Sequence, residues 1–288
     1  MRRKGGEERR FLRRRTGSVA AAAVAIALTV LSVSVLFVIV GHIFANGVGS
    51  LNLDFFTKIP KPYGETGGGI AQAILGTLAM LCVAGIMAIP IGVGTAIYVA
   101  EFGRGRFAEI VRFSVELLAE LPSIVVGVFI WALLVRNLTG YSGIAGACAL
   151  AVIMIPIVAR SVEEILKLVP DSIREAALAL GTPRWKVVIF IVIPSVLPGM
   201  LTGIMLAIAR AAGETAPLLL TSLGNSFFNL DMRRPMAAMP LQIYNYAVSP
   251  YDDWHRKAWA STLVLISIVA ILSAAVKLYA RRWKHEPN

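Results

Sequence analysis

Residues 159–194 read ARSVEEILKLVPDSIREAALALGTPRWKVVIFIVIP, a polar stretch between two long apolar segments. Asp171 or Ser172 can cap a helix over residues 173–180, because a side-chain oxygen at that position satisfies a free backbone N–H. Gly181 follows this helix and suits a left-handed backbone conformation after its last turn. The stretch therefore predicts a short helix that ends in a sharp turn.

A second helix is expected directly after this turn. Thr182 can cap it, with Pro183 at its first position, where the N–H that proline lacks would have no partner in any case. The first helix carries Glu175, Ala176 and Ala177, so its surface is small and smooth. Such a helix suits a groove on another protein, but an amphipathic helix resting on a bilayer has a similar composition. Composition alone does not separate the two interpretations.

The overall composition excludes a soluble globular domain. The 288 residues are 57% hydrophobic and 16% charged, with a mean hydropathy of +0.73. Soluble domains are about 45–50% apolar and about 25% charged. The apolar residues come in blocks of about 20, and each block is long enough to cross a bilayer. These features exclude a cytosolic enzyme, a nucleic-acid-binding module and a disordered chain. They predict an all-α polytopic protein surrounded by membrane lipid.

Six segments are long and apolar enough to be transmembrane helices. They are residues 18–44, 70–100, 113–135, 143–159, 195–222 and 258–280. The chain then divides into a basic tail at 1–17, a first transmembrane helix at 18–45, an external loop at 46–69, and a five-helix core at 70–281 that contains the polar loop at about 160–192. The segments 45–69 and 223–257 are rich in Gly, Pro and Asn, so we expect turns rather than helices there.

Positive charge decides the expected orientation, because Lys and Arg accumulate on the cytoplasmic side of a membrane protein. Of the 28 Lys and Arg residues, 20 fall on one side of the six-span arrangement, 7 fall on the other, and Arg210 lies within a span. The net charge of +11 is therefore interpreted as membrane topology rather than nucleic-acid binding. We expect a multi-pass protein of the cell (inner) membrane with both termini in the cytoplasm.

The sequence contains no pattern for a catalytic, nucleotide or metal site. The phosphate-binding loop G-x-x-x-x-G-K-[ST] does not occur. Cys82 and Cys148 have no spacing for a metal site or a disulfide framework, and the three histidines are scattered. We expect no catalytic residue, no metal and no cofactor on this chain.

An arginine and a glutamate lie inside the segment 195–222. Arg210 is about 22 Å along this segment at a helical rise of 1.5 Å per residue, and Glu214 follows one turn later. Ionisable groups within a membrane usually mark a transport pathway, but the two charges could also neutralise one another in a purely structural pair. We assign both residues, with the adjacent Thr215, to a candidate pathway and leave the structural alternative open.

Two further features concern the helix surfaces. Glu116 and Glu120 share one face of the segment 113–135, and they could either repel an anion or pair with a basic group. We include both in the candidate pathway. A stripe of small residues on the segment 195–222 recurs every four positions and predicts close packing against a neighbouring helix rather than pore lining. Its members are Gly199, Gly203, Ala207 and Ala211.

The polar loop resembles the EAA signature of ABC importer permeases. The family pattern is E-A-A-x3-G-x9-I-x-L-P, and the chain has E-A-A at 175–177, Gly181 and I-x-I-P at 191–194. It departs from the pattern only at Ile193, which stands in place of Leu. The resemblance implies a type I importer permease (MetI-like) core with an extra first span, and a coupling helix that docks on a separate ATPase. The coupling residues that it implies are Glu175, Ala176, Ala177 and Gly181.

The cargo is indicated by a narrower resemblance. The string RAAGETAP at 210–217, with PLQIYN at 240–245 and LPSIV at 121–125, is similar to one permease subunit of phosphate-specific ABC importers. This implies a transport subunit that pairs with a sister permease, an ATPase dimer that holds ATP and Mg, and an external phosphate-binding protein. A permease for another oxyanion and a secondary carrier remain as alternatives.

Overall fold

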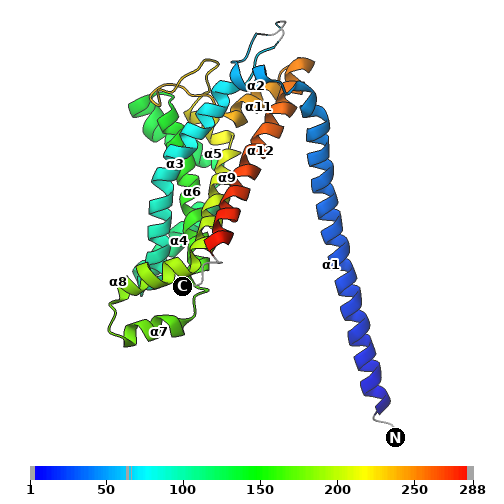
Figure 1. The fold of residues 1–288 in the computed structure, drawn as a ribbon, viewed down its shortest axis with the longest axis vertical. Helices are drawn as coiled ribbons and strands as arrows, with labels where there is room; N and C mark the ends of the chain where they lie inside the picture. Colours follow the sequence, from blue (N-terminus) through cyan, green and yellow to red (C-terminus); the bar gives the residue numbers. More distant parts are fainter. Residues whose placement is uncertain (1–3, 63–64, 66, 284–288) are drawn as a thin grey trace.

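The described part of the chain, residues 4–62, 65 and 67–283, consists of helices and connecting loops with no β-strand (Figure 1). In this computed structural model the α-helices are α1 (Lys4–Gly47), α2 (Leu53–Thr57), α3 (Ala71–Ile97), α4 (Arg106–Glu120), α5 (Ser123–Ile130), α6 (Gly143–Leu166), α7 (Asp171–Ala179), α8 (Arg184–Val187), α9 (Ile193–Ala212), α10 (Ala216–Thr221), α11 (Met239–Ala247) and α12 (Asp252–Trp283). The remaining segments are a 3₁₀ turn, η1 (Val48–Ser50), and three π-helical segments, η2 (Tyr98–Phe102), η3 (Trp131–Thr139) and η4 (Val188–Val192).

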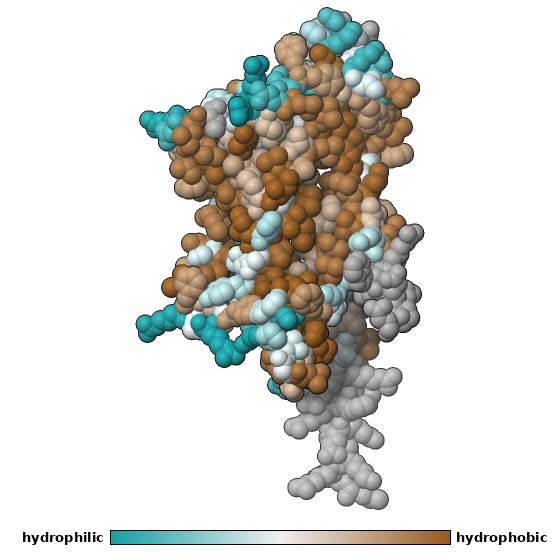
Figure 2. Space-filling view, turned by 60° about the vertical axis from the view of Figure 1, so that its left-hand side comes forward, coloured by the Kyte–Doolittle hydropathy of each residue, from teal (hydrophilic) through white to brown (hydrophobic). Residues whose placement is uncertain are grey.

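The long helices are suited to a membrane. Five are long and apolar enough to cross one, and a bent pair of helices provides a sixth span if it is counted as one. Figure 2 shows a broad apolar band between hydrophilic regions at the two ends. We call the end of the bundle with α7 and α8 the α7 end, and the opposite end, with α2 and α11, the α11 end (Figure 1). Helix α1 begins, and α12 ends, toward the α7 end.

The expected third span at 113–135 is wrong as a single helix. α4 ends at Glu120, α5 begins at Ser123, and the two are bent by 102°. Pro122 explains the break, because the residue before a proline disfavours the helical conformation. Leu121 is accordingly extended, with ψ at 132°.

The expected fifth span at 195–222 begins too late and continues too far. α8, η4 and α9 form one span from Arg184 to Ala212, so the second helix of the polar loop runs directly into the membrane segment. The π turn at 188–192 precedes Pro194, which cannot donate a backbone hydrogen bond to the preceding turn. The helix then breaks at 213–215, and α10 is a separate short helix.

The loops at the α11 end contain helices that the sequence reading missed. The side chain of Asn52 accepts a hydrogen bond of 2.8 Å from the backbone N–H of Phe55 and caps α2. α11 has a proline in its first turn, and its apolar face is buried. α12 begins at Asp252, six residues before the expected 258. The expectation of turns alone at 45–69 and 223–257 is therefore wrong.

The bundle is centred on α6, which packs between α3 and α9. A Cβ atom on Gly92 of α3 would lie 2.8 Å from the Val158 side chain of α6. A Cβ atom on Gly203 of α9 would lie 2.7 Å from Cβ of Ser161, also on α6. Only glycine permits these approaches. The stripe of small residues on α9 therefore packs against α6, as predicted, and Ala207 is fully buried. Gly199 and Gly203 also line a groove between α6, α9 and α12, which was not expected.

Helix α1 stands apart from this bundle (Figure 1). In its most apolar window, between 18 and 50, no residue is buried within the chain. Only its final turns touch α12, where His42 lies edge-on to Trp259 with 5.0 Å between ring centroids. α1 is helical from Lys4, so most of the expected tail at 1–17 continues the helix, and residues 1–3 lie outside the described part.

Candidate functional site

The polar loop forms a compact projection at the α7 end of the bundle (Figure 1). α7 ends at Ala179, and Gly181 has a φ of +80°. Its N–H donates to the carbonyl of Leu178 at 2.9 Å. No heavy atom lies within 4 Å of a Cβ added to Gly181, so this position requires glycine for its backbone conformation and not for space. The predicted helix, sharp turn and second helix are confirmed.

The expected caps are wrong. Pro170 occupies the position before α7, Pro183 occupies the position before α8, and neither helix has a side-chain cap. Asp171 is instead the first residue of α7, where a carboxylate is favoured by the helix dipole. Its Oδ1 accepts a hydrogen bond of 3.1 Å from Arg174. The loop itself runs from 167 to 183, shorter than the expected 160–192, because α6 continues to Leu166.

The residues of the EAA motif differ in their accessibility. Glu175, Ala176 and Gly181 are exposed, and Leu180 beside them is 87% exposed. Ala177 is buried against the bundle. The projecting surface of α7 is therefore a small apolar patch with one carboxylate. Ala177, on the opposite face, packs α7 against the bundle.

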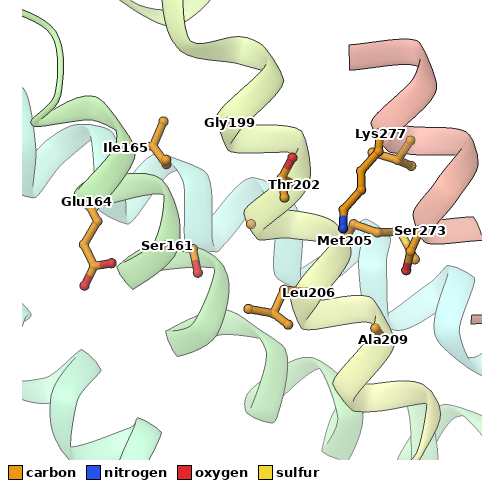
Figure 3. Close-up of a pocket in the computed structure, with 12 residues that line it drawn as sticks. Ser161, Glu164, Ile165, Gly199, Thr202, Met205, Leu206, Ala209, Ser273 and Lys277 are labelled. Carbon is orange, nitrogen blue, oxygen red and sulfur yellow. The ribbon is translucent and has the colours of Figure 1, made fainter. Parts of the chain in front are cut away.

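A groove of about 470 Å³ lies between α6, α9 and α12 in the half of the bundle nearer the α7 end (Figure 3). Ser161, Thr202 and Ser273 bring hydroxyl groups to it from the three helices, and Leu206 adds an apolar side chain. Figure 3 shows the ammonium group of Lys277 directed into the same space. The carboxylate-bearing Glu164 and the small residues Gly199 and Gly203 also line it. We call this space between α6, α9 and α12 the α9 groove.

The α9 groove was not predicted from the sequence, although one local pattern indicates it. Thr202, Leu206 and Arg210 recur every four residues, and all three are exposed on one stripe of α9. Arg210 therefore continues the line of the groove toward the α11 end. The contributions of Ser161 and Lys277 depend on helices distant in sequence, and no local pattern identifies them.

Arg210 and Glu214 form an open pair at the break between α9 and α10. The distance from Arg210 Nε to Glu214 Oε1 is 3.9 Å, and the side chains are 57% and 15% exposed. Glu214 and Thr215 lie in the break, so the expected continuous helix through both charges is wrong. Because the span starts at Arg184, Arg210 is roughly 39 Å along it at 1.5 Å per residue. It is thus farther from the α7 end than the expected 22 Å.

Glu116 and Glu120 lie on one exposed face of α4, and Glu120 is its last residue. Both are therefore in the second half of α4. Among the described residues, neither carboxylate forms an ion pair. Pairing with a basic group on this chain, one of the two expected roles, is not observed.

The two breaks in the bundle lie close together. A Cβ atom on Gly127 of α5 would lie 2.7 Å from the Cα of Pro217 on α10, so the two short helices are in contact. Both run toward the α11 end, where Ser142 N–H donates to the carbonyl of Thr221 at 3.0 Å. The segment after the break at Pro122 therefore packs against the segment after the break at 213–215.

Comparison with known proteins identifies a family and relatives that are similar to this chain. A family model described as "Binding-protein-dependent transport system inner membrane component" matches residues 88–285. The phosphate transport system permease protein PstA of Yersinia pestis is 42% identical over 240 residues, which are 83% of this chain and 81% of that protein. The protein of the same name from Haemophilus influenzae is 39% identical over 84% of this chain and 86% of its own length.

Solved structures show the same fold at low sequence identity. A chain of the inward-facing MetNI methionine ABC transporter has a TM-score of 0.64 and 20% identity, over 74% of this chain and 95% of its own. A chain of a bacterial alginate ABC transporter, in complex with an alginate-bound periplasmic protein, has a TM-score of 0.60 and 12% identity, over 90% and 93%.

Proposed function

The chain belongs to the family of binding-protein-dependent transport system inner membrane components, and we propose that it is the transmembrane permease subunit of an ATP-driven phosphate importer. The observation that carries this proposal is identity of about 40% to phosphate permeases over more than four-fifths of the chain. The fold expected from the sequence, an all-α type I importer permease, is confirmed by the structural neighbours. The chain is a transport subunit.

The coupling surface is assigned to the projection at the α7 end. Glu175, Ala176 and Gly181 would meet a cleft on a separate ATPase, while the buried Ala177 holds the helix in place. ATP and Mg would be bound and consumed there, on a dimer of that partner. This assignment is supported by the exposed, small surface of α7 between two helices that enter the membrane.

The α7 end would face the cytoplasm, with both termini. This orientation is supported by the excess of Lys and Arg on that side. The α11 end would then receive phosphate from an external binding protein. A reporter that is active only outside should be silent when fused after residue 170 or 288, and active when inserted near 62 or 240. Activity at 170 or 288 would contradict this orientation.

The pathway is assigned to the exposed face of α9. A guanidinium group presents a planar set of donors that matches a phosphate oxygen pair. Arg210 is exposed one turn beyond Leu206, on the same face of α9. Glu214 would orient Arg210 and limit how tightly an anion is held, with Thr215 beside it as a hydroxyl donor. A sister permease would close the other side of the groove, so that each subunit supplies half of the pathway.

Glu116 and Glu120 would act on the anion by repulsion. Both carboxylates are exposed, and neither is neutralised by a basic group within the described chain. Two carboxylates on one exposed face of α4 would repel phosphate and shorten its residence near this helix. We therefore keep both residues in the proposed pathway.

Reconstitution of the full complex in vesicles tests the proposal. Radioactive phosphate should accumulate only with ATP inside and the phosphate-binding protein outside. Accumulation of sulfate instead would favour the permease of another oxyanion importer. Phosphate movement that follows an ion gradient without ATP would favour a secondary carrier and contradict the proposal.

A further inference from the structure

A buried carboxylate lies at the end of α3 nearest the coupling projection. Glu101 is in the π segment η2, and its residue is only 3% exposed. A carboxylate removed from water in this way is costly unless it is paired and hydrogen-bonded. Its partner is Arg174, which is on α7 and 73 residues away in sequence. The pair therefore joins the coupling helix to a membrane span that is not its neighbour in the chain.

The geometry of this pair is that of a fork on a carboxylate. Arg174 Nη2 lies 2.7 Å from Glu101 Oε1, and Arg174 Nε lies 3.2 Å from each carboxylate oxygen. Such contacts are stronger and more directional than a single ion pair. The hydrogen bond to Glu101 is also the largest cause that raises the pKa of Arg174.

Arg174 also holds the end of α6. It donates to the carbonyl oxygen of Leu166, the last residue of α6, at 3.0 Å and to that of Val169, just after the helix, at 2.6 Å. One guanidinium thus connects α7, α3 and α6. Since α3 packs along α6, a displacement of α7 reaches the centre of the bundle through this side chain as well as through the backbone of the loop.

We propose that Arg174 and Glu101 form the positioning contact that transmits movement of the coupling helix to α3. The inference rests on the proposed function, because it assumes that a partner moves α7. The π turn that carries Glu101 supports it, since such turns interrupt the regular helical ladder and occur often at functional sites. Neither residue would touch phosphate. Their role is to keep α7 and α3 moving together.

A second ion pair at the same end provides a matched control. Arg112 of α4 lies 3.1 Å from Glu163 of α6, and Lys167 lies 2.6 Å from the same oxygen. This cluster is also partly buried, but it does not include α7. Arg112→Gln leaves Glu163 paired with Lys167, so assembly and coupling should both remain near parental values.

The test is the number of phosphate ions transported per ATP hydrolysed, in vesicles that contain the complete complex. Arg174→Gln and Glu101→Gln should each lower this ratio by about fivefold or more, the usual range for loss of coupling between two sites. ATP hydrolysis should continue, and the double variant should be no worse than either single one, because both remove the same contact. Arg174→Lys, which keeps the charge but not the fork, should recover part of the ratio.

Co-purification with the ATPase and thermal unfolding establish that each variant assembles. If Arg174→Gln does not assemble, Glu101→Gln decides, because Arg174 then retains its contacts with Leu166 and Val169. A parental ratio in assembled Glu101→Gln would overturn the inference, as would an equal loss in Arg112→Gln. Failure of the parental complex to transport phosphate would contradict the proposed function instead, so the two failures are distinguishable.

Discussion

Two arginine–glutamate pairs in this molecule have the same chemistry and opposite surroundings. Arg174 and Glu101, at the α7 end, have side chains that are 17% and 2% exposed, with a closest contact of 2.7 Å. Arg210 and Glu214, at the break after α9, are 57% and 15% exposed and 3.9 Å apart. The first arginine has its donors satisfied by a carboxylate and by backbone carbonyls. The guanidinium of Arg210 donates no hydrogen bond within the described chain, and its contact with Glu214 is a loose ion pair.

The difference in exposure and distance separates a pair that holds helices together from a pair that can bind an anion. A guanidinium that is already saturated with acceptors gains little from an incoming anion, and breaking its contacts leaves a buried charge without a partner. An exposed guanidinium with a distant partner can accept an oxyanion at little cost. The closed pair is therefore suited to positioning helices, and the open pair is suited to contact with the cargo.

The largest effect is expected when the exposed arginine, Arg210, is replaced, and this change tests the difference between the two pairs most directly. Arg210→Gln should lower phosphate uptake by about 150-fold or more, because each hydrogen bond to a charged group contributes roughly 1.5–3 kcal/mol and a phosphate would lose two of them. The thermal stability should hardly change, since exposed ion pairs contribute only about 0–1 kcal/mol. Uptake by the reconstituted complex and thermal unfolding measure the two effects.

The double variant Arg210→Gln with Glu214→Gln decides between the pathway and a structural pair. A structural pair predicts rescue, because the second change removes the charge left alone by the first. Contact with phosphate predicts no rescue. An assembled double variant with near-parental uptake would make the pair structural and withdraw Arg210 from the pathway.

A change at the turn that positions the closed pair should have the next largest effect. Gly181→Val forces a β-branched residue into the left-handed conformation, at roughly 1–2 kcal/mol or more. The coupling helix should be misdirected, and phosphate uptake should fall by about tenfold while ATP hydrolysis continues.

Gly181→Asn is the control for this change. Asparagine tolerates the left-handed conformation, and there is open space around a Cβ at this position. Its uptake should remain close to the parental rate. If the Val variant also transports normally, the direction of α7 does not depend on this turn.

The sequence was informative where a local pattern carries the physics. Hydropathy blocks identify the spans, and a glycine after a helix identifies the turn at Gly181. The break at Pro122 was also readable, because a proline inside an apolar run restricts the residue before it. The helices α2 and α11 were missed because their loops were judged by Gly, Pro and Asn content, although Asn52 is a capping residue.

Contacts between distant segments could not be predicted. Nothing local to Arg174 distinguishes Glu101, 73 residues away, from its closer neighbours Asp171 and Glu175. The α9 groove likewise needs α6 and α12 beside α9, so Lys277 looks in sequence like one more cytoplasmic charge. The sequence identifies the charged residues. The packing of distant helices determines which of them form buried pairs and which remain exposed.

The close contact between α9 and α6 beside the α9 groove can be altered without changing a charged residue. Gly203→Ala places a methyl group 2.7 Å from Cβ of Ser161, so α9 must move away from α6. Overpacking of this kind costs about 1 kcal/mol or more of folding free energy, so the thermal stability should fall. Uptake should fall a few-fold as well, because the displaced α9 lines the groove.

Gly94→Ala on α3 is the matched control for Gly203→Ala, because no atom lies within 4 Å of a Cβ there. It should leave thermal unfolding and uptake unchanged, or slightly stabilise the helix. Equal stability of both alanine variants would show that the close approach of α9 and α6 is not needed for the groove.

The smallest expected effect comes from Lys277, and it allows a comparison of the two basic residues on the proposed pathway, Lys277 and Arg210. Lys277 lines the α9 groove near the end of α12, where its side chain is exposed. A charge in such a place interacts weakly with an anion, at about 1 kcal/mol or less at 4 Å in bulk water. Lys277→Gln should therefore lower phosphate uptake by only two- to threefold, and the loss should shrink as salt is added because exposed charges are screened.

The effect of Arg210→Gln should persist at the same salt concentrations if phosphate is desolvated beside it. Uptake of both variants across a salt series measures this difference. A loss for Lys277→Gln as large as that for Arg210→Gln would place the tighter anion contact near the α7 end of the groove and reverse the order of the two cations along the pathway.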